Sequence, residues 1–165
     1  MAKRSFANKS WTPVAVADAA TMTANGACFL QGSSATARFV ISEVYMGGLA
    51  SAQAPSLMTL SRDSTVAVTS ITLGTNGSDA PLDVNSGSAA MTTGFSATTM
   101  PQRSATLQLL DLAYNAFGGI VRWVAYPGEE VSVYGNAVNV GEVSLSCFTG
   151  GTPGLMSSHI VYEPA

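Results

Sequence analysis

The feature that most constrains this chain is a succession of short segments that are apolar or alternate between apolar and polar residues, each closed by turn residues. The segments are rich in β-branched and aromatic residues, which favour strands. They predict strands at 12–18, 26–32, 36–47, 56–63, 65–74, 120–126, 131–134, 142–148 and 157–163. Two layers of such half-apolar strands bury their faces against each other, so a two-sheet arrangement is expected.

We therefore predict an all-β fold, an antiparallel two-sheet β-sandwich, with the jelly roll as its expected form. A closed barrel is the alternative. The length of 165 residues suits one domain with a sizeable core. We expect an N-terminal arm at 1–12, a single sandwich domain at 13–165 and a long loop at 75–104 within that domain.

Three segments carry more detailed expectations. The run "GGIVRWVAYPGEEVSVYGN" at 118–136 predicts a hairpin that turns at Pro127-Gly128 and carries Trp123 and Tyr134 on paired strands. The run "SATLQLLDLAYNAFGG" has some helical spacing, but its alternation favours a strand. In "RFVISEVYM" strict alternation predicts apolar groups on both faces, with Arg38, Val40, Ser42, Val44 and Met46 on one of them.

The composition indicates a surface that neighbouring molecules cover. Charged residues make up 10% of the chain and apolar residues 47%, whereas typical soluble domains have about 25% charged residues. A free monomer usually keeps itself soluble with more charge than this, so the low charge favours a place in an assembly. An uncrowded β-domain with a Ser- and Thr-rich surface is the alternative.

The arm and the long loop are the predicted contact segments, because neither has a complete strand pattern. The arm holds three of the seven basic residues, while the rest of the chain is acidic, which argues against nucleic acid as a partner. Aromatic residues of the arm would anchor it, and its basic residues would be attracted to an acidic surface. The predicted partner-binding residues are Lys3, Arg4, Phe6, Lys9, Trp11, Phe95 and Met100.

Residues for catalysis are scarce, and we predict a protein that is not an enzyme and has no cofactor, metal site or catalytic residue. His159 is the only histidine, which excludes a His-rich metal site. No G-x-S-x-G motif occurs, and "GGTPG" lacks the Lys of a P-loop. In "SRDST" we expect Arg62 and Asp63 to form a surface ion pair.

Targeting signals are also lacking in the sequence. The N-terminus has no apolar run of the kind that follows the basic residues of a secretory signal, and no segment is long and apolar enough to predict a membrane span. We therefore expect synthesis in the cytoplasm and no membrane partner.

Four runs together resemble small virion proteins of tailed bacteriophages: "SFANKSWTPVAVADAATMTANGACFLQGSSATARFVISEVYMGG", "LSRDSTVAVTS", "NAFGGIVRWVAYPGEEVSVYGN" and "FTGGTPGLMSSHIVYEP". In size and strand content the chain is similar to capsid decoration, or cement, proteins with jelly-roll folds. The resemblance implies a non-enzymatic decoration protein of the virion capsid that binds major capsid subunits, as a homo-oligomer, most simply a trimer.

Two alternatives stay open beside this reading. The first is another virion structural protein, namely a tail, head-to-tail or jelly-roll coat protein. The second is a carbohydrate-binding β-sandwich module, which could stack sugars on Trp11, Trp123 and some of the five tyrosines. Exposed aromatic side chains along one groove would favour the carbohydrate-binding module, and aromatic side chains buried in the core and in subunit contacts would favour an assembly protein.

Overall fold

The computed structural model describes residues 6–7, 27–32, 36–65, 80–83, 85, 91–94, 101–135, 141–147 and 155–165. The described part of the chain forms strands and contains no helix. The strands are β1 (Phe6–Ala7), β2 (Ala27–Gly32), β3 (Arg38–Gly48), β4 (Pro55–Thr65), β5 (Ala80–Pro81), β6 (Met91–Gly94), β7 (Gln102–Asn115), β8 (Ile120–Val124), β9 (Val131–Tyr134), β10 (Val143–Cys147) and β11 (Met156–Pro164).

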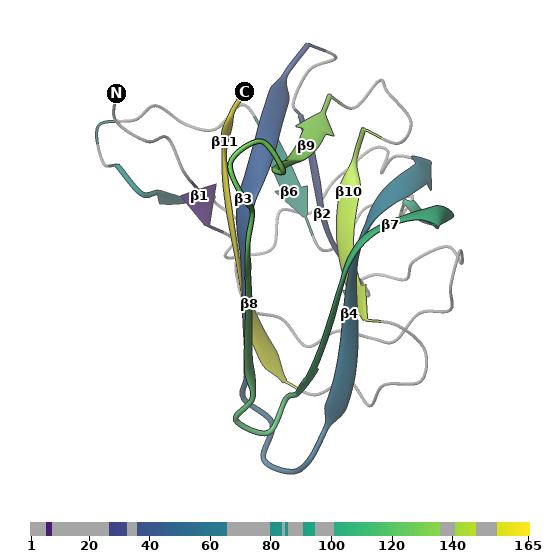
Figure 1. Cartoon of the computed structure of the whole chain (residues 1–165), viewed down its shortest axis with the longest axis vertical. Coiled ribbons are helices and arrows are strands. Elements are labelled where there is room, and N and C mark those ends of the chain that lie inside the picture. The colour runs from purple at the N-terminus through teal and green to yellow at the C-terminus, as the bar shows by residue number, and fades with distance from the viewer. Residues whose placement is uncertain are drawn as a thin grey trace.

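The strands form two antiparallel sheets that pack face to face, which confirms the predicted β-sandwich, while the jelly roll remains a prediction (Figure 1). The first sheet has the order β5-β1-β11-β3-β8, and β9 also pairs with β3. The second sheet has the order β6-β2-β10-β4-β7. The connections β3–β4 and β7–β8 cross between the sheets at the same end of the molecule, shown at the bottom of Figure 1.

The core lies between the sheets and is built from the inward side chains of both. Phe39 and Tyr162 meet there edge to face, with ring centroids 5.7 Å apart and planes at 84°. Each large apolar side chain buried in this way contributes about 1.5–3 kcal/mol. The buried cluster consists of Leu30, Phe39, Ile41, Val44, Met46, Met58, Leu60, Leu112, Val133, Val143, Leu145, Met156, Ile160 and Tyr162.

A β-bulge in β3 makes the predicted strict alternation of this segment wrong. Opposite β11, the register passes from Ile41 paired with Tyr162 to Glu43 paired with Val161, so Ser42 has no partner there. The extra residue shifts the pattern by one position. The buried side chains of β3 are consequently Phe39 and Ile41 before the bulge and Val44 and Met46 after it, all on the core side.

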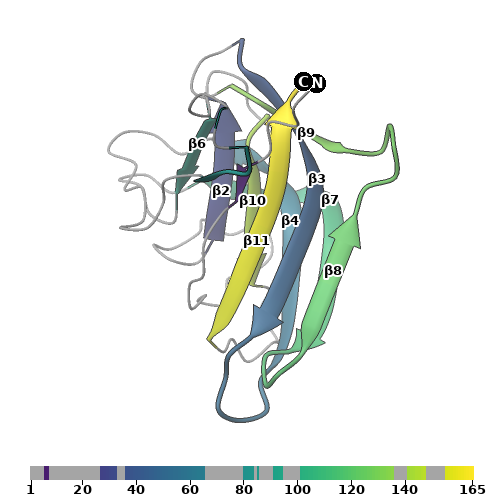
Figure 2. The same ribbon diagram turned by 90° about the vertical axis from the view of Figure 1, so that its left-hand side faces the viewer.

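The predicted hairpin at 118–136 is also wrong, because β8 and β9 pair with β3 and not with each other. Trp123 lies opposite Val44, and Tyr134 lies opposite Arg38, whose guanidinium is 5.3 Å from the centre of the Tyr134 ring. The segment 125–130 leaves the sheet at the β3 bulge and returns to it (Figure 2). The predicted turn at Pro127-Gly128 is confirmed, but a turn does not specify which strand its flanking strands will pair with.

Three short strands, β1, β5 and β6, lie in segments for which the sequence predicts an arm or a loop. The strand preferred for "SATLQLLDLAYNAFGG" is confirmed by β7, which ends at Asn115. The short strand β1 lies within the predicted arm, where Phe6 pairs with Tyr162 and with Pro81. β5 and β6 lie within the segment predicted as a long loop. The predicted strand at 12–18 lies outside the described residues, and so does the one at 65–74 except for Thr65, which ends β4.

Candidate interaction surface

Most of the predicted contact residues fall outside the described part of the chain. For Phe6 the structure describes the backbone, which pairs on both sides within the first sheet. The other predicted contact residues, which lie outside the described residues and stay predictions, are Lys3, Arg4, Lys9, Trp11, Phe95 and Met100.

An apolar tip, made by Leu49, Phe117 and Leu155, lies at the end of the sandwich where the chain crosses between the sheets. All three side chains are exposed, and 55% of the Phe117 surface is accessible. No charged residue occurs in the flanking segments 47–56, 113–121 and 155–158. A partner that covers the tip therefore has no formal charge to desolvate there.

Backbone hydrogen bonds tie the loops of the apolar tip together. Leu49 N–H donates to the Leu155 carbonyl at 2.8 Å, and Gly48 N–H donates to Gly119 at 2.8 Å. Asn115 Oδ1 accepts from the N–H groups of Ala54 at 3.0 Å and Phe117 at 2.9 Å. The backbone that carries Leu49, Phe117 and Leu155 is thus held by hydrogen bonds, so ordering it costs less on binding.

Two glycines permit close backbone approaches at the tip, Gly48 between β3 and the β7–β8 turn and Gly119 within that turn. A Cβ on Gly48 would lie 2.0 Å from the Ala116 carbonyl oxygen, and a Cβ on Gly119 would lie 2.0 Å from that of Asn115. Neither separation is possible for a side-chain carbon, so both positions require glycine in this geometry. Gly48 of "YMGG" and Gly119 of "FGG" are therefore required by the backbone geometry of the tip.

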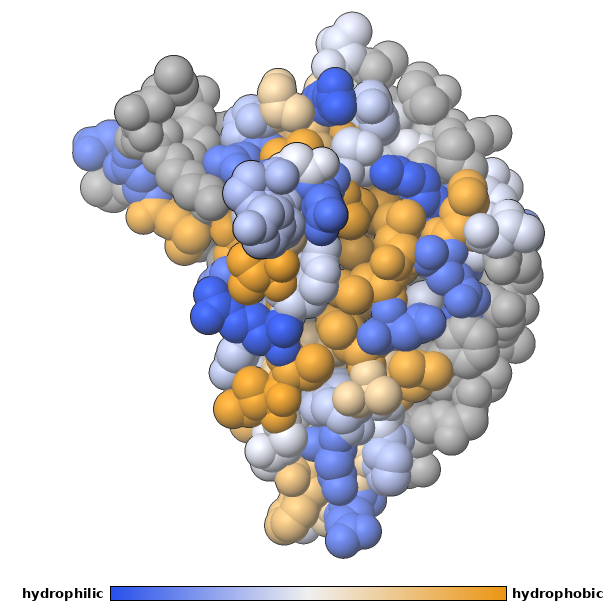
Figure 3. All heavy atoms as spheres, in the orientation of Figure 1, coloured by the Kyte–Doolittle hydropathy of each residue, from blue (hydrophilic) through white to orange (hydrophobic). Residues whose placement is uncertain are grey.

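The sandwich is open along the edge formed by β7 and β8, which we call the open edge. Leu110 and Tyr114 of β7 and Val121 and Trp123 of β8 pack against the core but are only partly buried. Figure 3 looks onto this edge and shows apolar side chains along its middle, with polar side chains on either side. The core thus reaches the surface between the two sheets.

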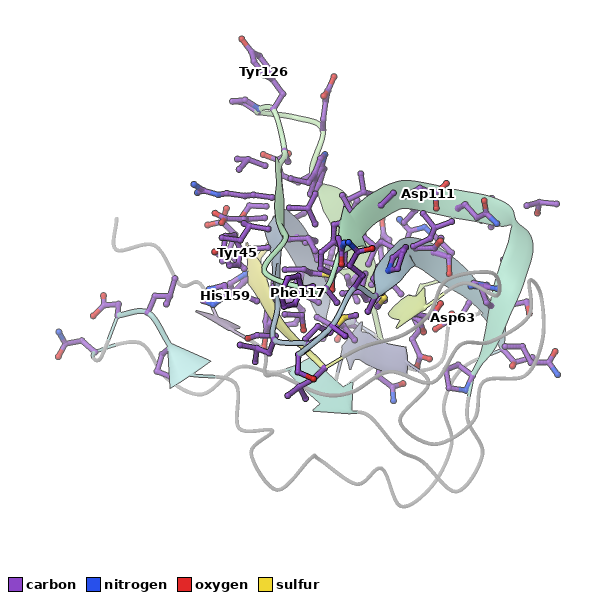
Figure 4. The ribbon with its side chains drawn as sticks, turned by 90° about the horizontal axis from the view of Figure 1, so that it is seen from below. Tyr45, Asp63, Asp111, Phe117, Tyr126 and His159 are labelled. Carbon is purple, nitrogen blue, oxygen red and sulfur yellow. The ribbon has the colours of Figure 1, made fainter. Side chains whose placement is uncertain are left out.

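The segment 125–130 carries the most exposed aromatic side chain described here. Glu129 N–H donates to the Tyr126 carbonyl at 2.8 Å, and Gly128 has a φ of 91°, which fits the third position of a type II turn with Pro127 in the second. Tyr126 is 76% exposed. Figure 4 shows Tyr126 projecting at the end of this loop, far from Phe117 at the tip.

A buried polar row crosses the outer face of the second sheet and is the main concentration of charge within the described residues. Asp63 N–H donates to the Glu142 carbonyl at 3.2 Å. The strand register, continued by one residue before β10, places Gln31 of β2, Glu142, Asp63 of β4 and Arg103 of β7 side by side. All four residues are at most 2% exposed. The expected surface ion pair of Arg62 with Asp63 is wrong.

Arg62 and Asp63 separate because neighbouring strand residues point to opposite faces of a sheet. Arg62 turns toward the first sheet and donates from Nη1 to the Ser132 carbonyl at 2.7 Å. Asp63 turns outward, where Ser144 Oγ donates to its Oδ2 at 2.5 Å. Arg103, which lies opposite Asp63, donates from Nη1 to Ser146 Oγ at 3.0 Å.

Burial is the dominant influence on the Asp63 carboxyl. It raises the pKa of Asp63 to about 7, against the opposing effects of hydrogen bonds from Glu142 and Ser144 and of the Arg103 charge. A hydrogen bond between two carboxyl groups requires a proton on one of them, since carboxylates only accept. With its pKa at about 7, the Asp63 carboxyl is largely protonated in the folded protein below neutral pH.

The polar row is closed off from solvent in the described structure. Its side chains are enclosed, so a substrate in solution has no access to them. Within the described residues, no three His, Cys, Asp or Glu side chains are grouped to hold a metal ion. His159 lies opposite Tyr45 on the outer face of the first sheet, away from Asp63 (Figure 4).

Comparison of the chain with protein-family models, with curated proteins and with solved structures found no match. In the part of the chain that the structure describes, no helix is long and apolar enough to cross a membrane. The features that bear on function are therefore the apolar tip, the open edge and the low charge of the chain.

Proposed function

We propose that this chain is a non-enzymatic structural protein of a tailed-bacteriophage virion, a capsid decoration (cement) protein that binds the major capsid protein. The observation that carries the proposal is the apolar tip: Leu49, Phe117 and Leu155 are exposed on loops held by internal hydrogen bonds, in a region without charge. Exposed apolar groups on a rigid end of a domain are typical of a contact with another protein.

The tip would act as the anchor on the shell. Phe117 offers an aromatic ring to an apolar recess between capsid subunits, and large aromatic side chains often supply much of the energy of an interface. Leu49 and Leu155 flank the ring and would exclude water around it. Because these groups carry no charge, the contact made by the tip should depend little on salt.

The remaining parts of the proposal follow the resemblance. These parts are a location in the virion capsid, a homo-oligomeric state such as a trimer, and an arm that reaches an acidic neighbour. Another virion structural role, in the tail or the head-to-tail junction, would use the same kind of surface. Among the described side chains, the exposed aromatic residues Phe117 and Tyr126 lie apart and offer no shared platform for a sugar (Figure 4).

The experiment measures the binding of purified protein to undecorated shells of the phage that encodes it. Phe117→Asp places a charge at the centre of the apolar tip, while Leu82→Asp makes the same kind of change at an exposed leucine beyond β5, at the opposite side of the first sheet. We expect Phe117→Asp to lower occupancy at least tenfold at limiting concentration, and Leu82→Asp to bind like the wild type.

The outcomes separate the proposal from its alternatives. Equal occupancy of wild type and Phe117→Asp would remove the tip from the contact. Failure of the wild type to bind shells at any concentration, together with density for the chain in the tail of intact particles, would replace decoration by another virion role. Absence of the chain from purified virions would overturn the virion assignment altogether.

A further inference from the structure

We propose that two copies of this chain associate by antiparallel pairing of their β8 strands, with the two-fold axis at Arg122, so that the first sheets of both copies become one continuous sheet. The inference concerns the open edge and not the apolar tip. It does not depend on the proposed binding to shells, and it replaces the trimer implied by the resemblance with a two-fold dimer.

The β8 strand offers a regular, unpaired edge. Among the described strands it pairs only with β3, and its register with β3 has no irregularity. The other open-edge strand, β7, has three register shifts against β4, and bulges of this kind protect an edge from further pairing. β8 contains neither proline nor lysine, which are common protective residues.

The backbone direction selects the register of the pairing. Ala125 N–H donates to Ser42 at 2.9 Å, and Gly48 N–H donates to Gly119 at 2.8 Å, so the odd-numbered residues of this segment face β3. The N–H and C=O groups of Ile120, Arg122 and Val124 consequently point to the open side, since these directions alternate along a strand. A two-fold axis at Arg122 lets all three residues form hydrogen bonds with the partner strand.

The side chains of β8 are self-complementary in this register. Ile120 meets Val124 of the second copy on the outer face. In the single chain both side chains are exposed, Ile120 to 66%. Val121 meets Trp123 of the second copy on the inner face, where both are partly buried. Aromatic and β-branched residues make favourable cross-strand pairs. The pairing thereby covers the partly buried side chains of Val121 and Trp123 at the edge of each core.

The charges of the edge are compatible with the pairing. The two Arg122 side chains would lie opposite each other, which is unfavourable for bare cations. Each one is already held by Glu43 of its own chain, with Nε–Oε1 at 2.7 Å and Nη2–Oε2 at 3.0 Å. The axis therefore brings together two neutral ion pairs.

The projecting segment 125–130 leaves the strand after Val124, so the paired region ends where this loop begins. Figure 2 shows the loop extending beyond the edge at the upper end of β8. In the antiparallel arrangement the loop of one copy lies beside the β7–β8 turn of the other. Tyr126 then approaches Gly118 of the second copy, where no other atom occupies the space of a side chain.

The test uses proline to block the edge without touching the ladder to β3. Val124→Pro removes an N–H that points to the open side, a position where edge strands tolerate proline. Val124→Thr keeps the N–H and a β-branched side chain and is the matched control. We expect wild type and Val124→Thr to sediment at twice 16.9 kDa, and Val124→Pro to sediment at 16.9 kDa with an unchanged circular dichroism spectrum.

A second measurement covers the case in which Val124→Pro does not fold. Amide hydrogen exchange on the wild type should show protection of Ile120, Arg122 and Val124 that is lost on dilution to the monomer. A wild type that is monomeric at all concentrations, or forms a trimer, would overturn the inference. So would a dimer in which these three amides exchange freely, or a folded Val124→Pro variant as dimeric as the wild type.

Discussion

Asp63 is the residue whose setting has the clearest consequence for stability. Its pKa is raised to about 7 in the folded protein by burial, whereas an unfolded Asp titrates near pH 4. Between these values the folded protein holds a proton that the unfolded chain releases. Stability must therefore fall as the pH rises from about 4 to about 7, and Asp63 adds no further pH dependence well above that range.

Replacing Asp63 by Asn should remove this dependence. The amide can donate to Glu142 and accept from Ser144, so the polar row keeps its hydrogen bonds without the proton. We expect Asp63→Asn to lower the slope of unfolding free energy against pH between 4 and 7, and to be more stable than wild type at pH 8. Urea denaturation of both proteins across this pH range measures the unfolding free energy. Parallel curves for both proteins would show that Asp63 ionises normally.

Asn115 holds the apolar tip through one side-chain atom. Its Oδ1 accepts two backbone N–H groups, from Ala54 and Phe117. Asn115→Ala should lower the unfolding free energy by about 1–3 kcal/mol, because both bonds are lost. Asn115→Asp retains an acceptor oxygen and should lose much less. Denaturation of the three proteins side by side decides this, and equal losses in the two variants would show that the oxygen is not what matters.

At the scale of the elements, the approach of β3 to the β7–β8 turn permits a matched test. A Cβ on Gly48 would lie 2.0 Å from Ala116 O, whereas one on Gly47 would meet nothing within 4 Å. Gly48→Ala should therefore destabilise the protein by about 1–3 kcal/mol or more, and Gly47→Ala should change stability by less than about 0.5 kcal/mol. Thermal unfolding compares them, and similar midpoints would contradict the close approach.

The sequence predicts the strands of this fold far better than their pairing. Alternation and turn residues locate β3, β7, β10 and β11, because those signals are local. The bulge at Ser42 depends on how β11 pairs with β3, and that register is set by contacts distant in the chain. For the same reason β8 and β9 read as a hairpin, although each finds its partner in β3.

At the scale of the whole molecule, the low charge indicates a covered surface, but the sequence does not locate that surface. The apolar tip combines side chains from three loops that meet only in the fold. The buried position of Asp63 likewise depends on what lies on the outer face of the second sheet, and the local sequence "SRDST" resembles an ordinary strand end. Isolated apolar residues in glycine-rich turns, such as Phe117 in "NAFGG", are the one local signal of the tip.

The arm provides the last prediction, which concerns the molecule and its shell together. Deleting residues 2–10 removes β1, which lies between β5 and β11, but the described core cluster contains no residue before Leu30. We therefore expect a folded sandwich with reduced stability. The deletion also removes Lys3, Arg4 and Lys9, taking the net charge from −3 to −3 − 3 = −6. Binding to shells should become weaker and less dependent on salt.

A variant with Lys3→Gln, Arg4→Gln and Lys9→Gln separates the two effects, because it keeps β1 and removes only the charges. It should keep the wild-type stability and show the same reduced salt dependence as the deletion, measured as shell occupancy across ionic strength. Wild-type occupancy at every salt concentration would show that the basic residues make no contact. If the deletion alone unfolds, β1 is required to close the first sheet between β5 and β11, and the arm belongs to the sandwich itself.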